Sequence, residues 1–279
     1  MTKGGGWNKR ASGRPFRKDR KPADRGRAPG PSDPEGLVRL YGTHAVEAAL
    51  NNPRRTIRRL LATENAEKRL ADAIAARKLA VERATPTDLD RMLGADAVHQ
   101  GLLLEVEPLP DPTLDELQRA AAEGAPLILL DHVTDPHNAG AVLRSAAVFG
   151  AAGVIMTQRH SPPLNGVLAK SASGALDALP VLLVQNLART MLELRDAGFV
   201  LLGLEGTASA RLESEPFDGK TAIVLGAEGK GLRELTAMTC DRLVSITTSS
   251  TFTSLNVSNA AAVALHSARI ARERRTTSQ

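Results

Sequence analysis

The chain has 279 residues, 42% of them apolar and only 3% aromatic, so a buried core must be built mainly from Ala, Leu and Val. Residues 1–36 hold ten Lys/Arg and four Asp/Glu, a net of +6, and the remaining residues net −1, so the overall charge of +5 belongs to the N-terminal segment. The single cysteine, Cys240, excludes an intrachain disulfide, and the apolar runs are too short to cross a bilayer. Because the N-terminal residues also lack the apolar stretch of a secretory signal, we expect a soluble cytoplasmic protein with no membrane partner.

Residues 1–36 are rich in Gly, Pro, Arg and Lys, and this composition predicts a disordered basic tail. A basic arm binds polyanions through counterion release, and Trp7 and Phe16 have rings on which bases can stack. A solubilising tail with no dedicated target is the alternative. We favour contact with nucleic acid.

Residues 37–108 read as a small α/β unit of a size that suits a binding module better than an enzyme. The pattern predicts helices at 43–50 with Thr43 as cap, 66–77 and 87–93, and strands at 57–62, 79–81 and 102–106. Residues 109–125 follow Pro108, include two more prolines and an acidic helical piece, and are a linker candidate.

From residue 126 onward, apolar strand-like runs alternate with helical segments. Strands are predicted at 127–133, 153–157, 181–184, 199–204, 221–225 and 243–246, and helices at 139–149, 166–174, 187–197, 232–238 and 258–272. This alternation is typical of an α/β fold with a mainly parallel sheet covered by helices.

Polar loops follow three of these strands. In the first loop Pro136 blocks helix propagation, Asn138 is expected to cap the next helix, and Arg144 follows six residues later. A plain helix cap followed by a surface arginine would give the same pattern.

The second loop runs from Gly226 to Gly231. It matches neither a Walker A loop nor G-x-G-x-x-G, but its three glycines suggest close backbone approach to a ligand. A turn that requires positive φ is the alternative, although it leaves Glu228 without an explanation.

The third polar segment contains Ser254 and Asn256 and opens the last helix. Taken alone it could be only a turn and a helix cap. Because parallel strands end at one edge of a sheet, however, we expect all three segments to converge on one site.

The three segments together resemble the signature motifs of the SpoU (TrmH) family. The matching residues are Asn138-x-Gly140-x-x-x-Arg144, Leu225-Gly-x-Glu228-Gly-x-Gly231 and Ser254-Leu-Asn256-Val-Ser258. The resemblance spans about residues 38–272 and implies an RNA ribose 2′-O-methyltransferase with the trefoil-knotted α/β fold called SPOUT. Residues 41–48 and 98–101 resemble the ribosomal-protein-like RNA-binding domain that precedes the catalytic domain. Residues 186–191 are similar to the members that methylate a guanosine of bacterial 23S ribosomal RNA.

The resemblance also implies a role for each motif position. Backbone at Gly226, Ile246 and Leu255 would hold S-adenosylmethionine, and the catalytic or RNA-facing positions would be Asn138, Arg144, Glu228, Ser254 and Asn256. The guanidinium of arginine stays protonated at neutral pH and therefore cannot readily take up a proton. We expect Arg144 to clamp phosphate rather than to remove a proton. The chain departs from the family at Thr247-Thr248, where Pro-Met is usual, which puts the rigidity of that loop in doubt.

RNA, ribosomal RNA foremost, and a second copy of the chain are the implied partners. The six histidines show no metal-ligand spacing, so no metal is predicted. A transfer RNA ribose methyltransferase and a non-catalytic RNA-binding ribosome-assembly protein remain alternatives. The missing G-x-G-x-x-G counts against a nucleotide-dependent oxidoreductase.

Overall fold

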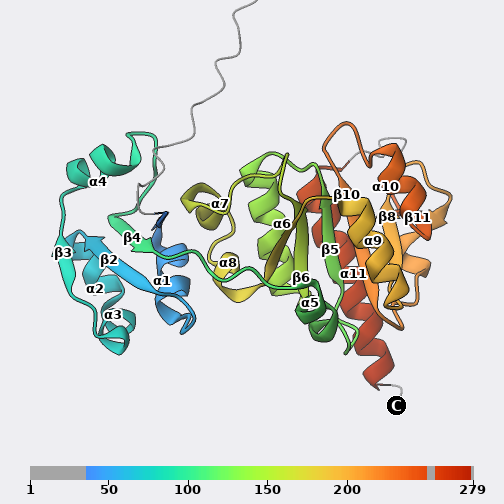
Figure 1. Cartoon of the computed structure of the whole chain (residues 1–279), viewed down its shortest axis with the longest axis horizontal. Coiled ribbons are helices and arrows are strands. Elements are labelled where there is room, and N and C mark those ends of the chain that lie inside the picture. Colours follow the sequence, from blue (N-terminus) through green and yellow to red (C-terminus); the bar gives the residue numbers. More distant parts are fainter. Residues whose placement is uncertain (1–35, 250–254, 278–279) are drawn as a thin grey trace, which may run out of the picture. The chain divides into compact units, whose positions relative to one another are not determined.

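Two β-sheets organise the computed structural model, which describes residues 36–249 and 255–277 (Figure 1). Almost all of the predicted basic tail, with Trp7 and Phe16, lies outside these ranges, and so does Ser254. Both sheets belong to one unit of the chain.

The first sheet is mixed and has the strand order β1-β4-β2-β3. The inner strand β4 is buried along its whole length and pairs antiparallel with both β1 and β2. The strands are β1 (Val38–Tyr41), β2 (Ile57–Ala62), β3 (Val81–Arg83) and β4 (Leu102–Val106), and the helices are α1 (Thr43–Asn51), α2 (Glu64–Arg69), α3 (Ala71–Arg77) and α4 (Pro86–Leu93).

This region departs from the predictions in four places. Strand β1 was not predicted, because four residues carry too short an alternation to stand out. The helix predicted at 66–77 breaks at Leu70, where φ is −111° and ψ is 18°. The strand predicted at 79–81 begins at Val81, because Lys78 ends α3 in left-handed geometry and the Leu79 amide bonds back to Ile74.

Thr43, predicted to cap the first helix, is not a helix cap. Gly42 occupies the N-cap position of α1 with φ of 87°, and Thr43 is the first helical residue. Its Oγ1 is buried and has no hydrogen-bond partner among the described residues.

The second sheet has seven strands in the order β7-β6-β5-β10-β8-β11-β9, and each neighbouring pair is parallel. The predicted mainly parallel α/β fold is confirmed. Its strands are β5 (Leu127–Asp131), β6 (Gly153–Thr157), β7 (Val181–Val184), β8 (Val200–Leu204), β9 (Ala210–Arg211), β10 (Thr221–Gly226) and β11 (Arg242–Ser245). The helices are α5 (Leu114–Ala120), α6 (Pro136–Val148), α7 (Gly166–Ser171), α8 (Ala175–Ala178), α9 (Leu187–Asp196), α10 (Glu234–Thr239) and α11 (Val257–Thr277), with a short 3₁₀ turn η1 (Leu212–Ser214).

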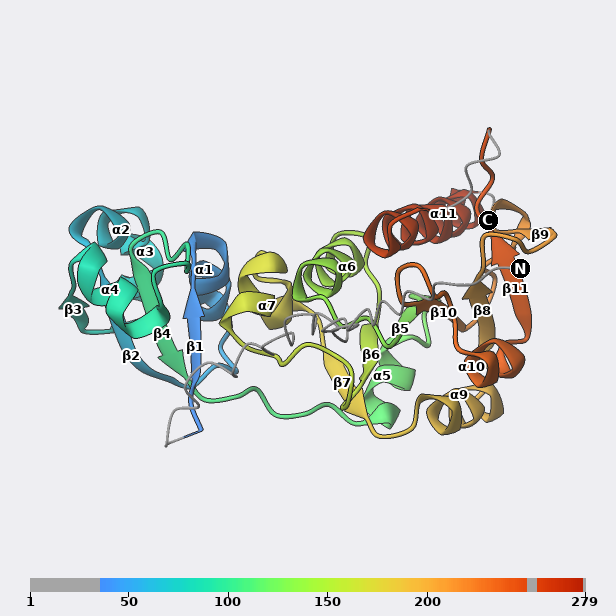
Figure 2. The same cartoon turned by 90° about the horizontal axis from the view of Figure 1, so that it is seen from above.

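Helices cover both faces of this sheet (Figure 2), with α6 and α11 on one face and α5, α9 and α10 on the other. Along β5, Ile128 and Leu130 pack into the cluster that contains residues of α6 and α11, whereas Leu127 and Leu129 pack into the cluster that contains residues of α5 and α9. A parallel strand buried on both faces needs apolar residues at every position, which explains the unbroken run in the sequence.

The order of the strands reverses at the middle of the sheet. From β5 the chain adds β6 and β7 on one side, then crosses to β8 on the other side, and β10 later fills the place between β5 and β8. The carboxyl ends of β5, β10, β8 and β11 therefore meet at one edge beside the switch point, where open α/β sheets bind their ligands.

Candidate functional site

Three predicted site residues from distant parts of the chain form one hydrogen-bonded network. Asn138 Nδ2 donates to Glu228 Oε2 at 3.0 Å, and Asn256 Nδ2 lies 3.0 Å from Asn138 Oδ1 and 3.2 Å from Glu228 Oε2. The contact between Asn138 and Glu228 joins residues 90 positions apart. The structure thus brings the three polar segments together at the carboxyl edge of the sheet.

The start of α6 fixes Asn138, although not as predicted. Asp135 is the N-cap, since its Oδ1 accepts from the His137 amide at 3.0 Å, and Pro136 is the first helical residue. Asn138 therefore lies within the first turn of α6, and the prediction that it caps the helix was wrong. The gain is rigidity, because a side chain on a helix is better fixed than one on a loop.

Gly140 lets α6 and α7 approach closely. A Cβ at this position would lie 2.4 Å from the Ser171 Cβ and 2.8 Å from the Ser171 carbonyl carbon, so a larger residue would push the helices apart. The glycine in the first motif is therefore explained by packing beside the site.

The glycine loop after β10 folds back on itself. Gly229 and Gly231 have φ of 75° and 66°, and the Gly231 amide donates to Ala227 O at 2.9 Å. At Gly226 a Cβ would meet the Gly231 carbonyl carbon at 2.1 Å. The glycines are therefore needed because parts of this loop pack closely against each other. The resulting tight turn carries Glu228 at its tip.

A cavity of about 310 Å³ lies between the glycine loop and the carboxyl ends of β8 and β11. The three residues expected to contact a cofactor, Gly226, Ile246 and Leu255, all line it, and so does Glu228. Its volume lies at the lower end of the range for small-molecule sites. Its apolar wall is made by Leu204, Leu225, Val244, Ile246, Leu255, Val257 and Ala260.

Thr247, where the chain departs from the family pattern, is held by Glu213. Its backbone N–H donates to Glu213 Oε1 at 2.9 Å and its hydroxyl to Oε2 at 3.0 Å. A proline could supply neither donor. Partial burial raises the pKa of the Glu213 carboxyl, but the bonds from Thr247 and the field of Arg211 outweigh it, and the pKa lies below its ordinary value. The Glu213–Thr247 clamp therefore fixes the residue that follows Ile246.

Arg144 does not join the network. It is exposed on α6 and makes no hydrogen bond or ion pair with any residue in the described ranges. Its guanidinium is therefore free to meet a ligand. Ser254, the remaining predicted site residue, lies outside the described ranges.

Two features at the carboxyl edge escaped the sequence analysis. Asp131 is 1% exposed at the end of β5 and accepts from the Arg233 amide and Nε at 3.1 and 2.7 Å, which ties the start of α10 to β5. His132 and His160 both have positive φ, and their ring centroids are 4.5 Å apart. Burial, Arg233 and His160 lower the pKa of His132 against the opposing effect of Asp131. A charged residue that ends an apolar strand was the available signal for Asp131.

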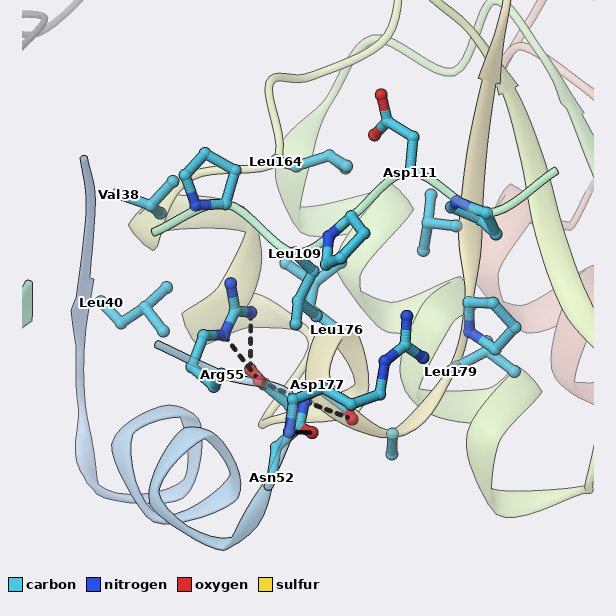
Figure 3. Close-up of a pocket in the computed structure, with 17 residues that line it drawn as sticks. Val38, Leu40, Asn52, Arg55, Leu109, Asp111, Leu164, Leu176, Asp177 and Leu179 are labelled. Atoms are coloured by element: carbon cyan, nitrogen blue, oxygen red, sulfur yellow. Dashed lines mark hydrogen bonds and ion pairs between the residues drawn. The ribbon is translucent and has the colours of Figure 1, made fainter. Parts of the chain in front are cut away.

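A second cavity, of about 150 Å³, is lined by none of the predicted site residues (Figure 3). Three of its polar side chains bond one another. Arg55 Nε and Nη2 donate to the two carboxylate oxygens of Asp177 at 2.9 and 3.1 Å, and Asn52 Nδ2 donates to Asp177 Oδ1 at 3.0 Å. The side chains of the ion pair are only 6% and 3% exposed. We interpret this arrangement as structural, because removing one partner would leave a buried charge unpaired.

Two broad classes of site find no support in the residues that the structure describes. No group of three or more His, Cys, Asp or Glu side chains among them is placed to hold a metal ion. Within the same ranges, no helix combines the length and the apolar character that a membrane span requires.

Comparisons with known proteins agree with this geometry. Residues 125–266 match the SpoU rRNA Methylase family, and residues 39–112 match the family described as RNA 2′-O ribose methyltransferase substrate binding. The chain is 42% identical over 234 residues to the 23S rRNA (guanosine-2′-O-)-methyltransferase RlmB of Ralstonia nicotianae, an alignment that covers 82% of this chain and 94% of the relative. It is 39% identical to the enzyme of that name from Pseudomonas syringae over 240 residues, or 83% and 95% of the two chains.

A solved structure shares the fold. The SpoU methyltransferase AviRb from Streptomyces viridochromogenes, in complex with the cofactor AdoMet, superposes with a TM-score of 0.72 at 25% identity. The superposition covers 85% of this chain and 91% of AviRb.

Proposed function

The chain belongs to the SpoU rRNA methylase family, and we propose that it transfers a methyl group from S-adenosylmethionine to a ribose 2′-hydroxyl of 23S ribosomal RNA, at a guanosine. The observation that carries this proposal is the Asn138–Glu228–Asn256 network, which meets the 310 Å³ cavity at Glu228. The network is polar and rigid, and the cavity beside it has an apolar wall. Methyl transfer needs both a place for the acceptor hydroxyl and a place for the donor.

The residues of the cavity fit S-adenosylmethionine. Apolar side chains around Leu225 and Ile246 suit the adenine ring, and backbone at Gly226, Ile246 and Leu255 is within the same wall. When bound, the cofactor supplies a methyl group on a sulfonium, which is already a strong electrophile. The protein therefore needs to position the acceptor more than to activate the donor.

The network is suited to that positioning. The Glu228 carboxylate accepts from the side-chain amides of Asn138, in the first turn of α6, and of Asn256, directly before α11, so its orientation is set from two sides. Asn256 is itself fixed, because its Oδ1 accepts from the Ser258 amide at 2.8 Å and from the Ser258 hydroxyl at 2.6 Å. A carboxylate held in this way can accept the proton of a ribose hydroxyl or orient it for attack.

Arg144 acts as a clamp on RNA phosphate in this proposal. Guanidinium stays protonated at neutral pH and binds phosphate bidentately. The exposed position of Arg144, with no partner in the described ranges, leaves its donors available for this contact. For Ser254 the family motif implies a role in orienting the ribose or the methionine end of the cofactor.

The two family matches support a division of the chain into domains. We infer an RNA substrate-binding domain at residues 37–108, a linker at 109–125 and a methyltransferase domain at 126–279, after a basic tail at 1–36. The linker is not featureless, since α5 lies within it and packs Leu117 into the core under β5. RNA is the partner, and a ribosomal RNA substrate implies the cytoplasm.

We further infer a trefoil knot and a homodimer. The place of β10 between β5 and β8 and the return of α11 onto α6 support the knot. Exposed apolar side chains on that pair of helices, Val148 at 70% and Val263 at 38%, support a dimer that covers them. A monomer in light scattering at micromolar concentration would contradict the dimer, and an experimental chain trace that can be pulled straight would contradict the knot.

The decisive experiment maps ribose 2′-O-methyl groups in 23S ribosomal and transfer RNA from a strain that lacks this protein. We expect one guanosine of 23S RNA to lose its methyl group and to regain it when the wild-type chain, but not Glu228→Gln, is restored. A lost methyl group in transfer RNA would redirect the substrate, and an unchanged map together with no S-adenosylmethionine binding would favour a non-catalytic RNA-binding protein.

A further inference from the structure

Glu205 lies at the centre of the cavity's strand wall. It follows β8 directly, and β8 lies between β10, which ends at Gly226, and β11, which leads to Ile246. Among the described residues that line the cavity, Glu205 and Glu228 carry the carboxylates. The network engages Glu228 and leaves Glu205 out.

The backbone of Glu205 is fixed, whereas its carboxylate is almost without partners. The Glu205 amide donates to Val244 O at 3.0 Å, and its carbonyl accepts from the Ala208 amide at 3.1 Å. The one side-chain contact within the described ranges comes from the Thr207 hydroxyl, at 3.4 Å from Oε1. Other carboxylates of this segment are engaged, since Glu213 holds Thr247 and Glu215 pairs with Arg242 at 2.8 Å.

The carboxylate of Glu205 projects across the cavity toward the glycine loop. Oε2 lies 3.4 Å from the point where a Cβ on Gly231 would stand, so the absence of a side chain at Gly231 keeps this space open. The residue is half-buried. A half-buried carboxylate that faces a cavity and has one long hydrogen bond is prepared to accept donors from a ligand.

The position of the network decides which part of the cofactor lies beside Glu205. The methyl group must reach the side of the cavity where Glu228 meets Asn138 and Asn256. The nucleoside is then directed toward β8 and β11, where Leu204, Val244 and Ile246 offer apolar contacts. Within a nucleoside, the ribose is the group with two adjacent O–H donors, and a carboxylate after a parallel strand is a common acceptor for ribose hydroxyls.

We propose that the Glu205 carboxylate binds the ribose 2′- and 3′-hydroxyls of S-adenosylmethionine and thereby selects an intact ribose. This inference rests on the proposed function, because it needs that cofactor in the cavity. It adds a specificity-determining residue outside the three sequence motifs.

Calorimetry with S-adenosylhomocysteine and its 3′-deoxy and 2′-deoxy analogues tests the inference without RNA and without turnover. Hydrogen bonds to a charged acceptor are strong, so we expect at least one deoxy analogue to bind the wild-type chain about ten- to a hundredfold more weakly than S-adenosylhomocysteine. Glu205→Gln should weaken the binding of S-adenosylhomocysteine by about the same factor. The two losses should not add, because both remove one interaction.

Matched controls separate this contact from a general effect. Glu193→Gln removes a carboxylate that is exposed on α9 and pairs with Arg189, and it should bind all three ligands like the wild type. If Glu205→Gln does not fold, the wild-type chain alone still decides, because equal affinities for the three ligands overturn the proposal. The proposal is also overturned if a folded Glu205→Gln variant binds all three ligands more weakly by the same factor. A wild-type chain that binds none of them overturns the proposed function first.

Discussion

The two sheets of this protein differ in how completely their charged side chains are paired. Across the four-stranded sheet, Arg39 pairs with Glu105 at 3.1 Å. Arg59 pairs with Glu82 through Nη2 at 2.6 Å and approaches Glu105 through Nη1 at 4.0 Å. Positive and negative charges thus alternate from β1 to β3, and each has a partner. At the carboxyl edge of the seven-stranded sheet, Glu228 and Glu205 form no ion pair in the described ranges, and neither does Arg144.

The difference shows where free charge has been retained. An exposed ion pair contributes little to stability, but it occupies both of its partners, which makes them poor ligands for anything else. A carboxylate or guanidinium kept without an opposite charge gains no ion pair from the folded protein, and its charge is available to a substrate. Charge without a counter-charge is therefore the better guide to function in this chain.

The largest expected effect follows from removing the charge at the network. Glu228→Gln keeps the size of the side chain but loses the carboxylate that Asn138 and Asn256 orient. We expect methyl transfer at saturating RNA to fall about a hundredfold or more, with S-adenosylhomocysteine affinity within a few fold of the wild type. Glu82→Gln removes a paired carboxylate of the four-stranded sheet and is the matched control. This variant should transfer methyl at the wild-type rate. Equal turnover in both variants would show that the unpaired carboxylate is no more important for the reaction than the paired one.

Arg144 should give the next largest effect. Arg144→Ala removes a guanidinium that has no partner within the described protein, so its loss should cost little stability and about ten- to a hundredfold in turnover at saturating RNA. Arg144→Lys should recover part of the rate, because it restores the charge but not the bidentate geometry. Near-normal single-turnover rates for Arg144→Ala would show that the residue does not act on the reaction.

The Glu213–Thr247 clamp should have an intermediate effect on the cofactor and none on RNA. Glu213→Ala releases the residue after Ile246, and we expect the S-adenosylhomocysteine Kd to rise about three- to tenfold, as fits the loss of one or two exposed hydrogen bonds. Thr247→Ser keeps both donors and should bind S-adenosylhomocysteine like the wild type. Thr247→Val keeps only the backbone amide donor, and its Kd should lie between those of the wild type and Glu213→Ala. A Kd for Thr247→Ser as high as that of Glu213→Ala would exclude the clamp.

The clamp also predicts a pH dependence. The pKa of Glu213 lies below its ordinary value of 4.5, because the hydrogen bonds from Thr247 and the charge of Arg211 outweigh its partial burial. A lowered folded-state pKa means that the clamp is complete above the ordinary value and is lost as the pH falls through the lower folded value. The affinity ratio between the wild type and Glu213→Ala should thus stay constant from pH 8 to about 5 and approach one in stronger acid. A ratio that changes near neutral pH would point to another group.

Most of the elements could be predicted from local patterns in the sequence, and the convergence of the motifs followed from the expected parallel sheet. Apolar runs marked six of the seven strands of the second sheet, all but the short, exposed β9, and the parallel order then required their carboxyl ends to meet. The misplacement of Asn138 came from a competition between caps, since Asp135 followed by Pro136 is the stronger start and lies three residues earlier.

What escaped prediction depends on contacts between distant residues. Glu213 and Thr247 are 34 positions apart, and no pattern around either residue indicates the other. Glu205 is one carboxylate after one strand, and its importance appears only when β8 is seen to lie between β10 and β11. The sequence reports which residues end a strand, but the neighbours of that strand are set by the topology.

The smallest expected effect concerns the four-stranded sheet, whose charged side chains are paired. The hydrogen bond and charge of Arg59 lower the pKa of Glu82, yet both side chains are well exposed, at 40% and 53%, where water screens their attraction. Glu82→Gln should therefore lower the Tm by less than about 3 °C, and the difference should shrink further in 1 M salt. A larger shift would mean that the alternating charges act as one network across the strands, and Arg39→Gln should then no longer add to Glu82→Gln in a double-mutant cycle. Additive, small shifts would instead confirm that this sheet neutralises its charges at little energetic gain.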